Sequence, residues 1–70
     1  MDQIDLQQLL DRLPPAMSRS EAPRLLGGLV SSKTLANADS NGTGPQGRFK
    51  LGRKVGYQTN LLLAWLQEKM

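Results

Sequence analysis

The sequence predicts a mainly α-helical domain with a small β-hairpin, in the order α-α-α-β-β-α. Three observations support this fold class. Apolar residues recur with helical spacing near both ends of the chain, and two short segments between them carry helix-capping signals. One segment around Gly52-Arg53 alternates apolar and other residues, as a hairpin does. With 70 residues, the chain has room for one domain and a modest core.

Residues 1–13 are predicted to form an N-terminal amphipathic helix. Four leucines stand at positions i, i+3, i+4 and i+7 and form one apolar stripe: Leu6, Leu9, Leu10 and Leu13. Pro14-Pro15 ends this helix, since proline lacks the N–H that continues it.

Two short helices are expected next. Ser18 and Glu21 have the spacing of a capping box in front of Ala22, and Gly27-Gly28 ends the helix that follows. Ser31 or Ser32 caps a third helix, over residues 31–40, which Asn41-Gly42 ends with a left-handed residue.

A β-hairpin and a last helix complete the predicted domain. Gly52 of the Gly52-Arg53 pair supplies the positive φ of a type II′ turn. The last helix begins at Gln58 or Thr59 and runs to Met70. We expect the apolar residues of these two elements to form most of the core: Phe49, Leu51, Val55, Tyr57, Leu62, Trp65 and Leu66.

Leu61 and Leu63 lie beside the inner stripe of the last helix and would be exposed without a cover. The N-terminal helix is one candidate cover, and a second copy of the chain is the other.

The composition excludes several function classes. With no cysteine and no histidine, the chain forms no disulfide, no thiolate or imidazole zinc site and no nucleophilic unit that needs either residue. No apolar run approaches the ~20 residues of a membrane span, and the N-terminus carries acids where a signal peptide carries bases. Gly42–Gly47 matches a dinucleotide fingerprint, but it follows a helix instead of a strand. We expect a cytoplasmic binding protein that is not an enzyme and takes no cofactor, metal, membrane or small-molecule substrate.

Positive charge gathers in one segment. The formal net charge is +3, yet residues 45–58 carry four cations and no acid, whereas residues 1–13 carry three Asp and one Arg. The cations are Arg48, Lys50, Arg53 and Lys54. A protruding basic hairpin suits DNA phosphates. Protection of a sheet edge against aggregation is the alternative reading of the same residues.

Helix, turn, helix, basic hairpin and helix is the order of a winged helix-turn-helix, whose second helix enters the major groove. The residues also carry a family resemblance over roughly residues 17–67. Its most specific part is Leu51-Gly-Arg-Lys-Val-Gly-Tyr57 followed by Leu62-Leu-Ala-Trp-Leu66, preceded by Met17-Ser-Arg-Ser-Glu-Ala-Pro-Arg-Leu-Leu-Gly-Gly28 and Ser31-Ser-Lys-Thr-Leu-Ala-Asn37. In these segments the chain resembles the excisionase and AlpA-type DNA-binding proteins of phages and mobile elements, in the MerR-like winged-helix group.

The resemblance implies sequence-specific binding of double-stranded DNA, with a role either in setting the direction of site-specific recombination or in controlling transcription. The expected contacts on the 31–40 helix are Ser31, Ser32, Lys33, Thr34 and Asn37, with Asn suited to adenine and Lys to guanine or phosphate. The alternative is that these polar residues make no DNA contact and only form the water-exposed outer face of the helix. Ala38 and Asp39 depart from the family pattern, in which many relatives have an aromatic or basic residue near the end of this helix, and we expect the acid to repel phosphate.

The expected partners are therefore duplex DNA, with self-association or contact with a recombinase or polymerase, and the expected location is the nucleoid. The alternative function is a protein-interaction adaptor with weak DNA affinity. It would dock partners through the leucines of the two terminal helices.

Overall fold

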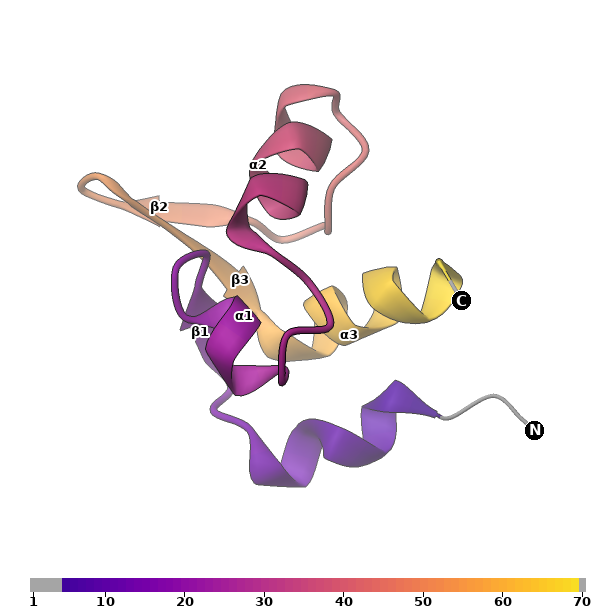
Figure 1. Cartoon of the computed structure of the whole chain (residues 1–70). Coiled ribbons are helices and arrows are strands. Elements are labelled where there is room, and N and C mark those ends of the chain that lie inside the picture. The colour runs from indigo at the N-terminus through magenta and orange to yellow at the C-terminus, as the bar shows by residue number, and fades with distance from the viewer. Residues whose placement is uncertain (1–4, 70) are drawn as a thin grey trace.

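The structure is a computed structural model that describes residues 5–69, and these form four helical segments and one three-stranded antiparallel sheet (Figure 1). In chain order the elements are η1 (Leu6–Arg12), β1 (Ala16–Ser18), α1 (Ala22–Leu25), α2 (Ser32–Ser40), β2 (Phe49–Leu51), β3 (Lys54–Gln58) and α3 (Thr59–Glu68). The fold is thus mixed α/β, where the sequence predicted a mainly α domain with a hairpin alone.

The central strand of the sheet is β3, which pairs with β1 on one side and β2 on the other. β1 is the element that the sequence analysis missed. Its three residues follow Pro14-Pro15 and carry no usable alternation, and only its pairing partner stabilises the extended backbone. The pairing sets Met17 opposite Tyr57, and both side chains are buried.

The predicted hairpin turn is confirmed. Leu51 pairs with Lys54, so Gly52 and Arg53 form a two-residue loop. Gly52 has φ +61°, and no residue other than glycine has a positive φ in residues 5–69. A positive φ at the first loop position alone is the type II′ pattern.

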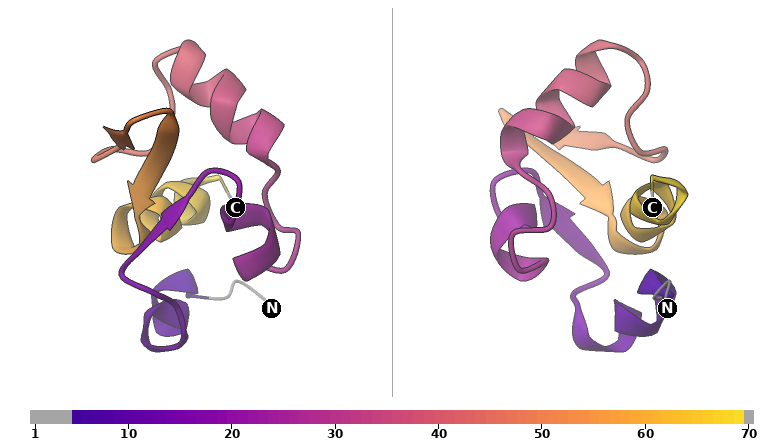
Figure 2. Two further views of the ribbon diagram at one scale, coloured as in Figure 1. Left: turned by 90° about the vertical axis from the view of Figure 1, so that its left-hand side faces the viewer. Right: turned by 45° about the vertical axis from the view of Figure 1, so that its right-hand side comes forward.

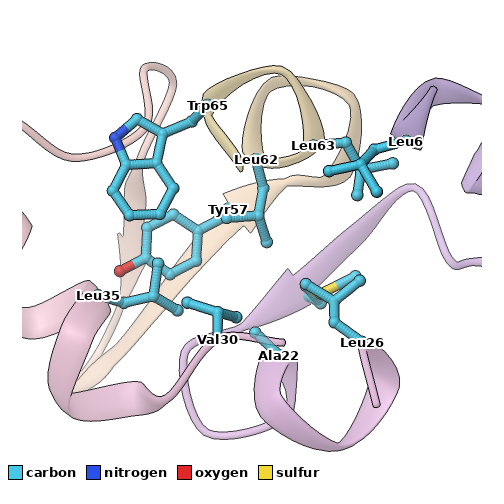
Figure 3. Packing of buried hydrophobic residues seen from close by; sticks show 10 residues of the cluster. Leu6, Ala22, Leu26, Val30, Leu35, Tyr57, Leu62, Leu63 and Trp65 are labelled. Carbon is cyan, nitrogen blue, oxygen red and sulfur yellow. The ribbon is translucent and has the colours of Figure 1, made fainter. Parts of the chain in front are cut away.

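The N-terminal segment is a 3₁₀-helix, not the predicted α-helix. Asp5 caps it, since its carboxylate accepts from the Gln7 N–H, and the Leu6 N–H donates to Oε1 of Gln67 at 2.7 Å. A 3₁₀-helix eclipses side chains at i and i+3, so it still directs leucines spaced by three toward α3. Leu63 of α3 is fully buried, with Leu6 beside it (Figure 3). The prediction that the N-terminal helix covers the last helix is confirmed for Leu63.

The capping signal of α2 is confirmed, but the one predicted for α1 does not cap that helix. The Glu21 N–H donates to Oγ of Ser18, and Oε1 of Glu21 accepts from the Ser18 N–H. These bonds close the turn before α1, whose own N-cap residue, Glu21, makes no side-chain cap hydrogen bond. Ser31 caps α2 through the Thr34 N–H. Gly42, at φ +76°, ends α2, and the Thr43 N–H donates to the Ala38 carbonyl as in a Schellman motif.

The core lies between the inner face of the sheet, α3, α1 and α2. Tyr57, Leu35 and Leu62 are fully buried there, with Trp65 beside them (Figure 3). Two residues expected in this core are instead exposed: Phe49 and Leu51 lie on the opposite sheet face, because they pair with Gly56 and Lys54. No helix within residues 5–69 is long and apolar enough to cross a membrane.

Candidate nucleic-acid interface

One end of the molecule carries both elements predicted to contact DNA. α2 and the β2–β3 hairpin lie at the upper end in all three views, and η1 lies at the lower end (Figures 1 and 2). Asp5 caps η1 and Asp11 lies within it, so both acids are separated from the basic hairpin. All nine predicted contact residues are exposed: Ser31, Ser32, Lys33, Thr34, Asn37, Arg48, Lys50, Arg53 and Lys54.

The outer face of α2 carries Lys33, Thr34 and Asn37. Leu35 is fully buried in the core, and this anchor turns the opposite helix face outward. Lys33 and Asn37 are one helical turn apart and so lie on one side. Ser31 and Thr34 are already engaged with each other, since Oγ of Ser31 donates to Oγ1 of Thr34 at 2.8 Å. Their first role is thus to cap the helix.

The hairpin carries its four cations on exposed side chains. In the part of the chain that the structure describes, only Arg48 among them forms an ion pair, with Nη1 3.6 Å from Oδ1 of Asp39. Lys50, Arg53 and Lys54 have no acid partner in residues 5–69. Their charge is available to a polyanion.

Asp39 is the residue that the sequence analysis misjudged. Its side chain is only 5% exposed, and its Oδ2 accepts from Nη2 of Arg19 at 2.6 Å and from the Tyr57 hydroxyl at 2.5 Å. Arg19 also donates from Nε to the Tyr57 oxygen at 3.0 Å. With Arg48 nearby, the carboxylate is enclosed and neutralised. The side chain does not project from α2 into solvent, so it lacks the exposed position that the expected repulsion of phosphate assumed.

The protonation of this network follows from its burial. Burial, and then the hydrogen bond to Asp39, raise the pKa of Tyr57 above its usual range, so the phenol stays a donor. The hydrogen bond with Tyr57 and the nearby carboxylate raise the pKa of Arg19, against the opposing effect of its partial burial. Arg19 thus stays a cation and Tyr57 a neutral hydroxyl, and both donate to the carboxyl group of Asp39.

One sequence signal could have identified the buried acid. Asp39 stands four residues after Leu35, the only buried residue of α2, and residues four apart share a helix face. Its partners Arg19 and Tyr57 lie 20 and 18 positions away in the chain, and no local pattern announces them.

The loop after α2 fits closely around the same carboxylate. A Cβ on Gly44 would overlap with Oδ1 of Asp39, so only glycine fits there. The loop is also held from the other side, because Nε1 of Trp65 donates to the Thr43 carbonyl at 2.7 Å. The loop thereby fixes the C-terminal end of α2 over the core.

The described residues contain no group of three or more acids that could hold a metal ion. No protein-family model matches the chain, and no curated protein or solved structure matches it either.

Proposed function

We propose that this protein binds double-stranded DNA through α2 and the β2–β3 hairpin, in the manner of a winged helix-turn-helix. In this proposal α2 reads the major groove and the hairpin contacts the adjacent backbone. The biological role is that of an excisionase-like directionality factor or an AlpA-type transcriptional regulator. These finer roles rest on the resemblance in residues 17–67.

The separation of charge is the observation that carries the proposal. Three hairpin cations without acid partners in residues 5–69 and Lys33 of α2 lie at one end, and Asp5 and Asp11 lie with η1 at the other. A protein with this polarity approaches a polyanion with its basic end first. Protection of a sheet edge would account for the hairpin cations but not for an exposed Lys33 on helix α2.

One feature of the connection differs from the usual motif. Residues 26–31 link α1 to α2, whereas a typical helix-turn-helix uses three to four residues. Leu29 in this link is exposed, and the link passes below α2, away from the hairpin tip (Figure 1). Its last residue, Ser31, caps α2, so the longer link still ends at the proposed DNA face.

The burial of two leucines gives the adaptor alternative less support. Leu6 and Leu63 of the two terminal helical segments are buried and hold η1 against α3, so these two side chains are not open to a partner.

The proposal is tested by duplex binding measured with Lys33→Ala and with Arg12→Ala as the matched control. Each variant removes one positive charge from an exposed side chain, but Arg12 lies on η1 at the far end. We expect Lys33→Ala to weaken binding by about tenfold and Arg12→Ala by less than about twofold. Sites selected from a random duplex pool supply the target.

The salt dependence gives a second measure. If all four hairpin cations pair with phosphates, they contribute roughly −3 to −4 to the slope of log K against log salt. A slope near zero, or equal losses in Lys33→Ala and Arg12→Ala, would contradict the proposed interface.

A further inference from the structure

A hollow of about 220 Å³ opens between the turn before α1, the first turn of α2 and the tip of the hairpin. Three cationic and three hydroxyl side chains line it: Arg19, Arg53, Lys54, Ser18, Ser20 and Ser32. None of its lining residues is acidic. Three of the six, Ser18, Arg19 and Ser20, lie outside the contacts that the sequence predicted.

One wall of this hollow, the turn at residues 18–20, is held in place by hydrogen bonds. The Arg19 N–H donates to the Val55 carbonyl at 2.8 Å, and Ser18 pairs with Gly56, so this turn is tied to β3. Glu21 holds the same turn through its hydrogen bonds with Ser18. A wall that is already ordered loses little entropy when a ligand binds.

Hydrogen-bond donors remain free around the hollow. An arginine has five N–H donors, and Arg19 uses one on Tyr57 and one on Asp39. The Ser32 hydroxyl makes no hydrogen bond within residues 5–69, and Arg53 and Lys54 form no ion pair there. The hollow thus offers charge and directed donors together, and this combination suits a phosphate oxygen.

The helix adds to the same effect. Ser32 is the first residue of α2, which is nine residues long. Because Ser32 lines the hollow, the N-terminus of α2, the positive end of the helix dipole, lies beside it. The volume is smaller than the ~300 Å³ at which small-molecule pockets begin, so the hollow suits one phosphate group better than a whole nucleotide.

We propose that this hollow holds a single phosphodiester group of the DNA backbone, with Arg19 as a ligand that Asp39 and Tyr57 orient. The inference rests on the proposed function and adds to it a fixed contact point between α2 and the hairpin. Such a contact sets the register of α2 in the groove, because phosphate contacts position a protein on the duplex.

The test places a carboxylate in the hollow with Ser32→Glu. The matched control is Asn60→Glu, which makes the same charge change on an exposed residue in the first turn of α3, beside η1. Both changes suit a helix N-terminus, so both proteins should fold. We expect Ser32→Glu to bind duplex DNA about tenfold more weakly than Asn60→Glu and to lower the salt slope by about 1. Equal losses in the two variants would overturn the phosphate site.

A second measurement tests the phosphate site by itself, and it applies even if the wild-type chain binds no duplex and the proposed function fails. Inorganic phosphate is titrated at constant ionic strength while backbone amide shifts are followed. We expect shifts at Ser20, Ser32 and Lys54 that Ser32→Glu abolishes, which would establish an anion site independent of DNA. Shifts spread over the whole surface, or none at these amides, would overturn the hollow as a phosphate site.

Discussion

Asp39→Ala should destabilise the protein far more than its position on a short polar helix suggests. The change removes the acceptor for the Tyr57 hydroxyl, and Tyr57 is fully buried. A buried donor left without a partner costs about 1–3 kcal/mol. Arg19 loses its carboxylate too, but its side chain is 26% exposed and water compensates in part, so we add only about 1 kcal/mol. The expected loss of unfolding free energy is about 2–4 kcal/mol.

Thermal and urea unfolding, followed by circular dichroism, measure this loss. For a domain of this size, each 1 kcal/mol lowers Tm by about 4–8 °C, so we expect a decrease of about 10–30 °C. Asp11→Ala is the control, because Asp11 is exposed on η1 and the charge change is identical. We expect it to stay within about 0.5 kcal/mol of the wild type. If Asp39→Ala were no less stable than Asp11→Ala, the buried network would not stabilise the fold.

A double-mutant cycle separates the network from the loss of a single side chain. Arg19→Met removes the guanidinium and keeps the apolar stem. If the two groups act through each other, Asp39→Ala should cost at least about 1 kcal/mol less in the Arg19→Met background than in the wild type. Strict additivity would refute the coupling.

Three further comparisons test the packing and the titration. Gly44→Ala should lose about 1–3 kcal/mol of unfolding free energy, because the new Cβ would overlap the buried carboxylate of Asp39. Gly56→Ala should lose less, because its Cβ would meet the exposed ring of Phe49, which can move. The midpoints of urea unfolding compare the two variants. Leu6→Ala should lose about 2 kcal/mol of unfolding free energy, whereas Leu51→Ala, at a side chain 73% exposed, should lose under about 0.5 kcal/mol. Urea unfolding measures both, and equal losses would contradict the cover provided by η1. Folding raises the pKa of Tyr57, so its hydroxyl contributes its full stabilisation below the unfolded pKa of about 10, and this contribution is lost as the pH rises through the folded pKa. Urea unfolding at a series of pH values should therefore show a steeper loss of stability at alkaline pH for the wild type than for Tyr57→Phe. Parallel curves would refute this.

The elements that the sequence predicted correctly are those with local chemical signals. The Ser31 cap, the Gly42 stop and the Gly52 turn all form as expected. The reciprocal hydrogen bonds of Ser18 and Glu21 form as well, but in the turn before α1 instead of as its cap. Each signal is a hydrogen bond or a positive φ decided within a few residues, so the neighbouring sequence is sufficient to specify it.

The errors arise where partners distant in sequence decide the structure. β1 exists because Ala16–Ser18 pairs with β3, some 40 positions away. Phe49 and Leu51 were expected in the core, but the register of β2 on β3 turns them to the outer face. The leucine spacing of η1 suits both a 3₁₀-helix and an α-helix, so the periodicity located its buried side without fixing its type.

The buried carboxylate also changes how the charge of the interface should be counted. A simple sum of formal charges counts Asp39 as −1 on the positive face. If only the net charge of that face mattered, Asp39→Asn would strengthen DNA binding. The structure gives Asp39 a second effect, because its carboxylate holds Arg19 in the wall of the phosphate hollow. We therefore expect Asp39→Asn to bind duplex DNA more weakly than the wild type at a temperature where both are folded. Asp11→Asn removes an acid that holds no cation in residues 5–69 and should bind at least as tightly as the wild type. An Asp39→Asn protein that binds more tightly would show that Arg19 needs no orienting partner, and that only the net charge of this face matters.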